Sequence, residues 1–413
     1  MKVLAINAGS SSLKYRLLDM SSESIIISGN CGKIGFENSF LSFKLKNNTK
    51  KVKIKCKIKN YEQAVQKMAE ILLDPKIGAL VSFDEIFAIG HRIVHGGNIF
   101  KNSVLIDNEI IKKISDLSIL APLHNAIEIE TIKACRKFFS KEKPEIAVFD
   151  TAFHSDLEPY AFLFPVPYEY YEKYKLRRYG FHGLSHQFVS EKCAKLLGKN
   201  LSNLKIISCH LGNGSSVTAI KNSKVVDTTM GLTPLDGLIM GTRCGQIDPS
   251  VVIFLQEKEN LNLTEISELL NKKSGFLGIS GVSSDAKSVV SLANKGHKRC
   301  KLACDILQHQ LTKTIGSYVS IMNGCDAIVF TAGIGENYYL LREKVFENFS
   351  YIGIELDKKR NQSIINRKQG KISTDNSKVD VLVIPTNEEL IIARETVKIA
   401  TKETQNLLNF IKT

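Results

Sequence analysis

The sequence predicts an α/β protein built from two domains of similar architecture. Its 413 residues are enough for two hydrophobic cores. Strand patterns alternate with helix patterns along most of the chain, which is typical of α/β domains. A strand, a glycine- and serine-containing loop and a second strand occur at residues 3–18 and again at 204–222. This restart indicates a duplicated fold, with one phosphate loop in each half and a ligand held in the cleft between the halves.

The first half opens with strands and then alternates. Short apolar runs at 3–6, 13–18 and 24–28 are separated by turns and read as antiparallel strands. Helical spacing follows at 61–74 and 125–139, and buried strands are expected at 85–94 and 145–150.

The second half begins near Thr151. After the strand–loop–strand of 204–222, helices are expected at 248–260 and 300–322. Apolar runs at 327–335 and 381–385 predict two more strands, and the residues from 387 to 411 have the spacing of an amphipathic helix.

Composition excludes several classes of protein. Hydrophobic residues make up 43% of the chain and charged residues 24%, which are the values of a globular protein. No apolar run approaches the roughly 18 residues of a membrane span, and the apolar N-terminal stretch is too short for a signal peptide. The nine cysteines include no C-x-x-C pair, which favours reduced thiols and a cytoplasmic location.

The net charge of +14 raises the question of nucleic-acid binding. Eight lysines and no acids lie between Lys44 and Lys59, and from Lys51 onward lysines alternate with apolar residues. That alternation predicts a strand with one apolar face and one lysine face. Lysines commonly protect an edge strand from aggregation, and no aromatic residue interleaves them to stack on bases. The pattern therefore favours a solvated edge strand.

Three glycine-containing stretches could bind phosphate. They are NAGSSSLK (7–14), HLGNGSS (210–216) and TAGIGEN (331–337). Glycines and serines in a turn offer backbone N–H groups to an anion, and Lys14 adds a positive charge. Each stretch alone is equally compatible with an ordinary turn. None has the G-x-G-x-x-G or G-x-x-x-x-G-K-[ST] spacing, so the dinucleotide and P-loop interpretations fail.

Cationic residues gather in four further stretches: GHRIVHGG (90–97), APLHNA (121–126), RRYGFHGLSHQF (177–188) and MGTRCGQIDP (240–249). The pairs His91/His95 and His182/His186 have i, i+4 spacing, but neither has the H-E-x-x-H glutamate, so zinc is not favoured. Any one cation is more often structural than functional. Together they predict positive charge around an anion, supplied by Arg92, His124, His182 and Arg243.

Acidic residues follow two of the predicted strands. Asp150 ends one strand, and Glu388 and Glu389 follow another. A carboxylate at such a strand end often holds Mg²⁺. The alternative is a surface acid or a helix-capping charge, which we favour for Glu389.

Taken together, these motifs resemble the acetate kinase family. The two hallmark stretches are VLAINAGSSSLKY (3–15) and GHRIVHGG. The other blocks that match in order are APLHN, FDTAFH, YGFHGLSH, HLGNGSS, GTRCGQIDPS, GIGEN and PTNEEL. The resemblance covers essentially the whole chain. No single block is specific for the family, but their combination in this order is.

The resemblance implies two ribonuclease-H-like α/β domains of the actin and sugar kinase type, with the active site in the cleft between them. It places residues 1–150 and the C-terminal helix 389–413 in the first domain and residues 151–388 in the second. It also implies a cytoplasmic homodimer that binds no nucleic acid and no membrane. The implied ligands are acetate, ATP or ADP, acetyl phosphate and Mg²⁺ or Mn²⁺.

The resemblance also assigns roles to residues. Catalytic residues would be Asp150, His182, Arg243 and His124. Arg92 would grip the substrate carboxylate. Apart from the resemblance, a small apolar substrate pocket is expected from the residues that adjoin the proposed anion-binding residues in the chain: Val94, Leu123, Phe181 and Pro234. Asn7 and Glu388 would form the metal site. Nucleotide-binding residues would be Lys14, His210, Leu211, Gly212, Asn213, Gly214, Asp285, Ala286, Lys287, Gly333, Ile334, Gly335, Glu336 and Asn337.

One position departs from the family pattern. The adenosine-site triplet usually ends in arginine, whereas here it ends in Lys287. Lysine lacks the planar guanidinium that stacks on a base, which leaves the nucleotide preference open.

The chemistry explains the need for these cations. A carboxylic acid is already ionised at pH 7 and needs no base. Two like charges about 4 Å apart repel by roughly 4 kcal/mol at an effective dielectric of 20, so the attack of one anion on another needs positive charge nearby. The hypothesis is direct in-line transfer, with Arg92 and Arg243 holding the reacting anions, His182 donating to the phosphoryl group and Asp150 orienting Arg243 or a metal-bound water.

Two alternatives remain open at this stage. One methylene separates acetate from propionate, which is worth only about 1–3 kcal/mol, so a propionate kinase is close. An actin-like ATPase without an acid substrate would share the phosphate loops but would not need Arg92, His182 and Arg243.

Overall fold

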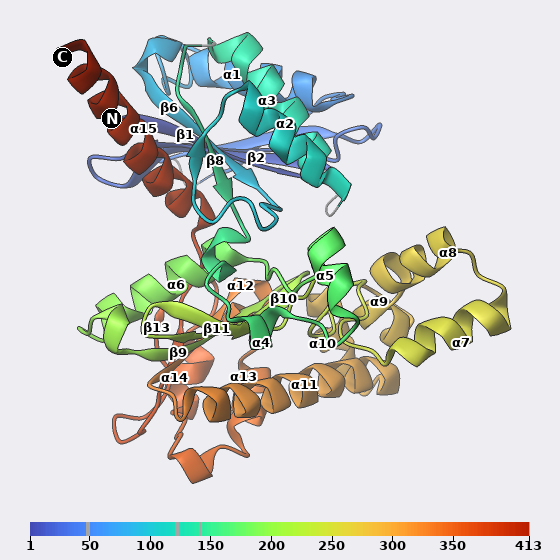
Figure 1. The fold of residues 1–413 in the computed structure, drawn as a ribbon. Coiled ribbons are helices and arrows are strands. Elements are labelled where there is room, and N and C mark those ends of the chain that lie inside the picture. Colours follow the sequence, from blue (N-terminus) through green and yellow to red (C-terminus); the bar gives the residue numbers. More distant parts are fainter. Residues whose placement is uncertain (47–49, 120–123, 141, 413) are drawn as a thin grey trace. The chain divides into compact units, whose positions relative to one another are not determined.

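The structure is a computed structural model that describes residues 1–46, 50–119, 124–140 and 142–412, with side chains described except at 404 and 406–412. The chain divides into two compact units, one formed by Met1–Ala152 with Asn387–Thr413 and the other by Phe153–Thr386 (Figure 1). Glu388 therefore belongs to the first unit, because it begins the C-terminal helix that packs there. Each unit is described by itself.

The first unit contains one mixed sheet. Its strands are β1 (Lys2–Gly9), β2 (Ser12–Asp19), β3 (Ser24–Gly32), β4 (Phe40–Leu45), β5 (Val52–Lys55), β6 (Ile86–Ile93), β7 (Val104–Leu105) and β8 (Glu145–Phe149). They lie in the order β5-β4-β3-β2-β1-β6-β8-β7, with β1, β6 and β8 parallel and the chain from β1 to β5 antiparallel.

Helices cover both faces of this sheet. They are α1 (Tyr61–Leu73), α2 (Asn108–Asp116), α3 (Asn125–Phe139) and α15 (Glu388–Lys412). Leu4 and Ile6 of β1 belong to the core beneath α1 and α3, whereas α15 packs on β1, β6 and β8 from the other side (Figure 1). Because both faces are covered, β1 is an almost continuous apolar run.

The second unit repeats the same strand order. Its strands are β9 (Lys205–Leu211), β10 (Ser215–Lys221), β11 (Lys224–Thr228), β12 (Ala327–Thr331), β13 (Gly370–Lys371) and β14 (Asp380–Val383). They lie in the order β11-β10-β9-β12-β14-β13, with β9, β12 and β14 parallel. The sequence β11-β10-β9-β12-β14 matches β3-β2-β1-β6-β8 of the first unit in both order and direction. The duplicated α/β architecture predicted from the sequence is confirmed.

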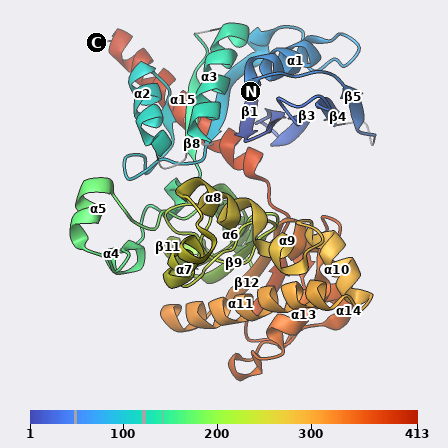
Figure 2. The same ribbon diagram turned by 90° about the vertical axis from the view of Figure 1, so that its right-hand side faces the viewer.

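Its helices again lie on both faces of the sheet (Figure 2). They are α4 (Pro159–Phe162), α5 (Tyr168–Tyr174), α6 (Gly183–Leu196), α7 (Pro249–Glu259), α8 (Leu263–Glu268), α9 (Gly275–Ser280), α10 (Ala286–Asn294), α11 (Lys298–Met322), α12 (Ala332–Asn337), α13 (Tyr339–Phe346) and α14 (Lys358–Ser363). Val189 and Cys193 of α6 pack in one core, and Leu307 and Leu311 of α11 pack in the other.

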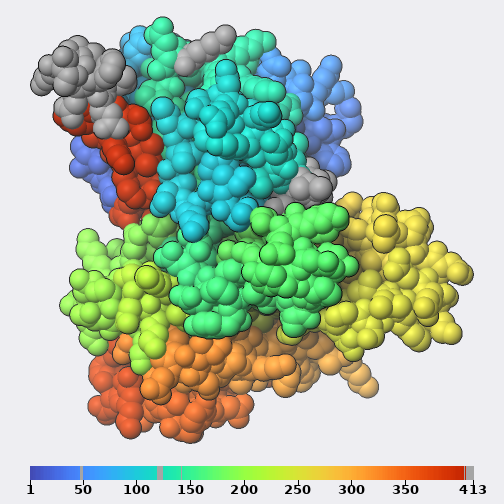
Figure 3. Space-filling model, in the orientation of Figure 1, coloured from blue at the N-terminus to red at the C-terminus, as the bar shows by residue number. Residues whose placement is uncertain are grey.

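The segment of α7 and α8 forms one side of the second unit in Figure 3, where it is drawn in yellow. Asp248 caps α7 and Pro249 occupies its first turn, which is the expected start of a helix. None of the α7 residues is buried. Its exposed side chains include Val251, Ile253 and Phe254, and Leu263 of α8 is also exposed.

Three predictions about local structure need correction. The lysine-rich strand is only the four residues of β5, and Val52 and Ile54 on its predicted apolar face are exposed, because β5 is the last strand of the sheet and extends past the helices. The connection between the strands expected at 3–6 and 13–18 is shorter than those bounds imply, because β1 runs to Gly9, β2 starts at Ser12, and only Ser10 and Ser11 turn. The strand expected at 327–335 ends at Thr331, where α12 begins.

Among the described residues, every helix is either too short or too polar to cross a bilayer.

Candidate active site

Three polar side chains meet at the carboxyl ends of neighbouring parallel strands in the first unit. Asn7 lies near the end of β1, Arg92 near the end of β6, and Asp150 directly follows β8. Arg92 donates from Nη2 to Oδ2 of Asp150 over 2.9 Å and from Nη1 to Oδ1 of Asn7 over 3.3 Å. The sequence named all three residues, and parallel strand ends bring them together.

Three carboxyl groups act electrostatically on Arg92. Burial alone would lower the pKa of Arg92, but the carboxyl groups of Asp150, Glu388 and Glu128 outweigh it and raise that pKa. Asp150 itself is fully buried. The partner that the structure gives Asp150 is Arg92, which the sequence hypothesis of an oriented Arg243 or metal-bound water did not foresee.

Glu388 and Lys14 complete this group of side chains. Lys14 stands opposite Asn7 in the β1–β2 ladder, which puts both side chains on one face of the sheet. Burial raises the pKa of Glu388 to about 7, with Arg92 and Lys14 acting against that rise and Asp150 adding to it. Glu389 is paired with Arg16 at 3.3 Å and is buried, so it is not the surface acid that the sequence suggested as one alternative.

The loop after Arg92 is held by residues that the sequence analysis did not single out. The carboxyl group of Glu128 accepts from the N–H of Val94, the amide of Asn125 donates to the carbonyl of His95, and the N–H of Gly96 donates to the Thr151 hydroxyl. These partners are buried, and two of them lie in the first turn of α3. In the sequence Glu128 resembles an ordinary acidic residue of a helix first turn, so no local signal marked it.

Val94, predicted to bind substrate, belongs to this loop, and His124, predicted to be catalytic, precedes the helix that holds it. Val94 is buried, and His124 occupies the position just before α3. Leu123, also predicted for the apolar pocket, lies outside the described residues.

In the second unit, His182 and Arg243 converge on Gly214. A β-carbon placed on Gly214 would lie 3.2 Å from the His182 ring and 3.5 Å from Nη1 of Arg243. Any larger residue at 214 would therefore intrude between a histidine and an arginine that are 61 positions apart in the chain. This juxtaposition is the central feature of the second unit's site.

His182 is held in one orientation by two contacts. Its Nδ1 lies 2.9 Å from the Ser216 hydroxyl, and its ring stacks on His210 with ring centroids 4.0 Å apart. The backbone of His182 is left-handed, with φ of 58°, at the start of α6. A left-handed non-glycine residue is strained, and such strain gathers at functional sites.

The same serine also contacts a second histidine. Nε2 of His186 lies 2.8 Å from the Ser216 hydroxyl, and its Nδ1 lies 2.8 Å from that of Ser208. His210 in turn contacts the hydroxyl of Ser185 at 2.8 Å. The His182/His186 pair thus belongs to a histidine–serine network, and the described residues contain no group of three or more ligands suited to a metal ion.

Arg243 donates to the carbonyl of Pro234 over 3.2 Å and to Sδ of Met240 over 3.8 Å. Among the described residues, no carboxylate oxygen lies within 4.0 Å of its guanidinium. Burial lowers the pKa of Arg243, although a guanidinium stays charged. A partly buried cation with no carboxylate beside it in the described part of the chain is suited to an anionic ligand. Phe181, another predicted pocket residue, is buried beside His182 in the chain.

The predicted nucleotide loops lie against one another in this unit. A β-carbon on Gly212 would be 3.5 Å from that of Ala332, where α12 begins. One on Gly241 would clash with the side chain of Asn213 and approach the carbonyl of Ser284 to 2.9 Å. The loop 210–214 therefore contacts the segment around 332, and Gly241 lies close both to this loop and to the residue preceding the predicted adenosine triplet.

The α12 segment, which carries Gly333, Ile334, Gly335, Glu336 and Asn337, is fixed by a buried arginine. Arg342 donates to the carbonyls of Gly335 and Glu336 over 2.7 and 2.9 Å and to Asn361 over 2.7 Å. The space around Gly333 is open: no other atom lies within 4 Å of a β-carbon placed there. A ligand can therefore approach the backbone at this point.

The adenosine triplet begins α10. The carboxylate of Asp285 accepts from the N–H of Ser288 over 3.1 Å, so it serves as the helix cap. Hydrogen bonds from Ser288 lower the pKa of Asp285. Ala286 follows it, and Lys287 is exposed.

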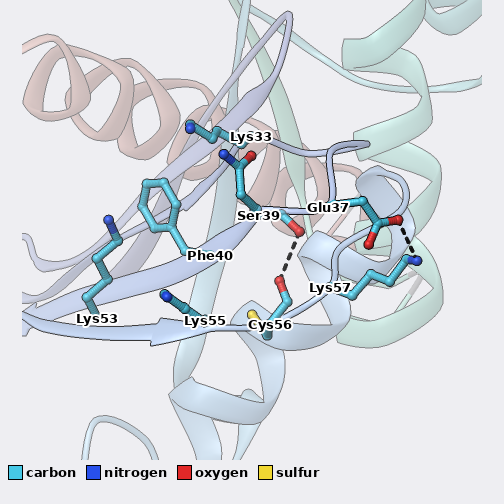
Figure 4. A pocket seen from close by; sticks show the side chains of 9 residues that line it. Lys33, Glu37, Ser39, Phe40, Lys53, Lys55, Cys56 and Lys57 are labelled. Atoms are coloured by element: carbon cyan, nitrogen blue, oxygen red, sulfur yellow. Dashed lines mark hydrogen bonds and ion pairs between the residues drawn. The ribbon is translucent and has the colours of Figure 1, made fainter.

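A separate pocket of 620 Å³ lies at the edge of the first unit's sheet, and none of the predicted site residues lines it (Figure 4). Lys33, Lys53 and Lys55 surround the ring of Phe40, and Lys57 pairs with Glu37 at 2.7 Å. These lysines are exposed, as expected for a solvated edge strand.

Comparison with known proteins identifies the family of this chain. The Acetokinase family matches residues 2–394. This chain belongs to the acetokinase family. It is 50% identical over 400 residues to a protein named acetate kinase from Caldanaerobacter subterraneus subsp. tengcongensis, covering 97% of this chain and 99% of the relative.

Solved structures agree as well. The crystal structure of Porphyromonas gingivalis acetate kinase matches with a TM-score of 0.91 and 42% identity, over 96% of this chain and 99% of the other. A propionate kinase from Francisella tularensis matches with a TM-score of 0.89 and 40% identity, over the same shares of the two chains. The resemblance drawn from the motifs is therefore confirmed at the level of family and fold.

Proposed function

We propose that this chain is an acetate kinase that transfers the γ-phosphoryl group of ATP to acetate, reversibly. The observation that carries the proposal is the pairing of His182 and Arg243 around Gly214, with no carboxylate near Arg243 in the described part of the chain. Two fixed donors of this kind suit the oxygens of a transferring phosphoryl group. Family membership supplies the acceptor, because the relatives are named acetate kinases.

In the proposed reaction a carboxylate oxygen of acetate attacks the γ-phosphorus, and the bond to the oxygen bridging the β- and γ-phosphates breaks. ADP leaves with that electron pair, and acetyl phosphate forms. No proton is removed, so Asp150 need not be a base. Its ion pair with Arg92 supports a positioning role, in which it aims the guanidinium at the acetate carboxylate.

Asn7 and Glu388 suit Mg²⁺ because both offer oxygen ligands, and Mg²⁺ commonly takes one or two protein ligands and completes its shell with phosphates and water. Bound there, the ion would neutralise charge on the phosphate oxygens of ATP. The nucleotide itself is assigned to Lys14, to the loop 210–214, to α12 and to residues 285–287. The open backbone at Gly333 supports that assignment.

A homodimer is part of the proposal. Exposed apolar side chains on α7 support association of two copies, because an aqueous surface rarely exposes several such residues together. An Ile253→Lys, Phe254→Lys double variant should then run as a monomer in sedimentation analysis. The matched variant Tyr351→Lys, which changes an exposed side chain elsewhere in the second unit, should not alter the mass.

We also propose a cytoplasmic location. All nine cysteines are free in the structure, and reduced thiols are typical of that compartment.

The test of the activity is a hydroxylamine trap for acyl phosphate, with purified protein, MgATP and acetate, propionate or butyrate in parallel. Hydroxamate formed fastest from acetate supports the proposal. Faster product from propionate would assign the chain to propionate kinases, like its structural neighbour. ATP hydrolysis without any hydroxamate would refute an acid substrate and favour the actin-like ATPase.

A further inference from the structure

Glu128 is a buried carboxyl group in the first turn of α3, only 2% exposed. Its two oxygens lie 3.1 and 3.2 Å from the backbone nitrogen of Val94, so both can accept from that N–H. A buried glutamate whose hydrogen-bonding partner is a backbone amide is uncommon and calls for a reason.

The reason lies in where the sheet ends. The β6–β8 ladder stops at Ile93, whose carbonyl accepts from the N–H of Asp150 over 2.9 Å. Val94 is the next residue and has no strand partner for its N–H. Because a buried N–H must be satisfied, Glu128 takes the place of the missing strand.

Arg92 lies two residues before Val94. The hydrogen bond between Glu128 and the Val94 N–H therefore also restrains the backbone from which the Arg92 side chain extends. The backbone of residues 93–96 is held from two elements: α3, through Glu128 and Asn125, and the end of β8, through Asp150 and Thr151. Glu128 and Asp150 are also electrostatically coupled to Arg92, Asp150 more strongly through its ion pair.

We propose that Glu128 is a positioning residue for acetate: its acceptor oxygens fix the backbone at Val94, and this fixes where the Arg92 guanidinium meets the substrate carboxylate. The proposal rests on the proposed function, in which Arg92 binds acetate. It makes Glu128 act on the acid substrate and leaves the nucleotide, assigned to other residues, unaffected.

For this role the Glu128 side chain must be long enough to bring an acceptor oxygen to the Val94 N–H, and it need not be charged. Burial raises the pKa of Glu128 to about 8, opposed by Arg92, so the neutral form is tolerated in this site. Glutamine keeps an acceptor oxygen at the same distance. Aspartate keeps the charge but is one methylene shorter, and methionine keeps the length but offers no oxygen.

The experiment measures kcat, KM for acetate and KM for MgATP in Glu128→Gln, Glu128→Asp and Glu128→Met. Loss of one buried hydrogen bond corresponds to roughly a five- to thirtyfold effect, which should appear as a rise of KM for acetate in the Asp and Met variants. The Gln variant should stay within about threefold of the parent, and KM for MgATP should stay within about twofold throughout.

Glu145→Gln is the matched control. Glu145 is a glutamate of the same unit, 3% exposed, that pairs with Arg136 at 2.7 Å and with His91 at 3.2 Å. It should lower the unfolding temperature without changing KM for acetate.

Two results would overturn the proposal: KM for acetate unchanged in the Asp and Met variants, or KM for acetate and for MgATP raised together. If Met prevents folding, the comparison of Asp with Gln still decides. Absence of acetate phosphorylation in the parent protein would instead refute the proposed function, so the two failures are distinguishable.

Discussion

Replacing Arg243 by alanine should remove transition-state stabilisation while leaving the second unit folded. The structural cost is small, because Arg243 donates to the carbonyl of Pro234 and, more weakly, to Sδ of Met240, and it forms no ion pair with a described residue. A bond of that kind contributes about 0.5–1.5 kcal/mol to stability.

The catalytic cost is larger. A guanidinium about 4 Å from a phosphoryl charge interacts by roughly 4 kcal/mol at an effective dielectric of 20. Loss of one fixed donor to a developing anion costs about 2.7–4 kcal/mol, or 10²–10³-fold in kcat. We therefore expect kcat of Arg243→Ala to fall by about 10²–10³-fold, with the unfolding temperature lowered by a few degrees.

The assay is hydroxamate formation at saturating acetate and MgATP, with thermal unfolding followed in parallel. Arg360→Ala is the control, because Arg360 forms ion pairs with Asp357 and Asp375 on the surface of the same unit. Turnover of Arg243→Ala within tenfold of the parent, or an equal loss in Arg360→Ala, would refute the assignment. Partial recovery on addition of free guanidinium would show that charge is what was lost.

Two further outcomes follow from contacts described above. Gly214→Ala should lower kcat about three- to tenfold with little loss of stability. Its β-carbon would lie 3.2 Å from the His182 ring, which Ser216 and His210 hold in place. The control Gly316→Ala places its β-carbon in open space beside α11 and should leave kcat unchanged. The pKa of Glu128 is raised to about 8 in the folded state, so the folded state binds more protons than the unfolded state and the free energy of unfolding should fall as pH rises from about 5 to 8. Urea titrations in the presence of a chelator should show a shallower fall in Glu128→Gln, and identical slopes would contradict the raised pKa.

Much of the fold could be predicted because the spacing of apolar residues along the chain distinguishes its helices from its strands. The helix expected at 125–139 is α3 without change of bounds, since its apolar spacing is long and regular. The predicted length of the β5 strand was too great. Lysines and apolar residues alternate as far as Ile58, whereas the pairing of β5 with β4 stops at Lys55. Alternation describes which side chains could face a core; whether a helix covers them depends on distant parts of the chain.

The site divides in the same way. Arg92, Asp150 and Asn7 could be predicted because each stands at the end of an apolar run, where parallel strands present their side chains. Ser216 and Glu128 could not. Ser216 contacts His182 only because the β9–β10 register sets it opposite His210, and Glu128 matters only because β6 ends one residue before Val94. Such contacts arise from where elements stop, which periodicity leaves uncertain by several residues.

The return of the chain to its first unit has a consequence for biosynthesis. The chain leaves that unit after Ala152 and re-enters it only at Asn387, where α15 begins, so the second unit is an insertion within the first. Gly90 of β6 lies against Ile392 and Thr396 of α15, so the face of the sheet that carries Arg92 and Asn7 lacks its cover until α15 has been translated. The N-terminal strands emerge from the ribosome first, yet their unit is completed last, after all 234 residues of the second unit have been made. We therefore expect a nascent chain stalled before α15 to contain a folded second unit and a first unit open to proteolysis, so that only chains that include α15 carry a finished first sheet.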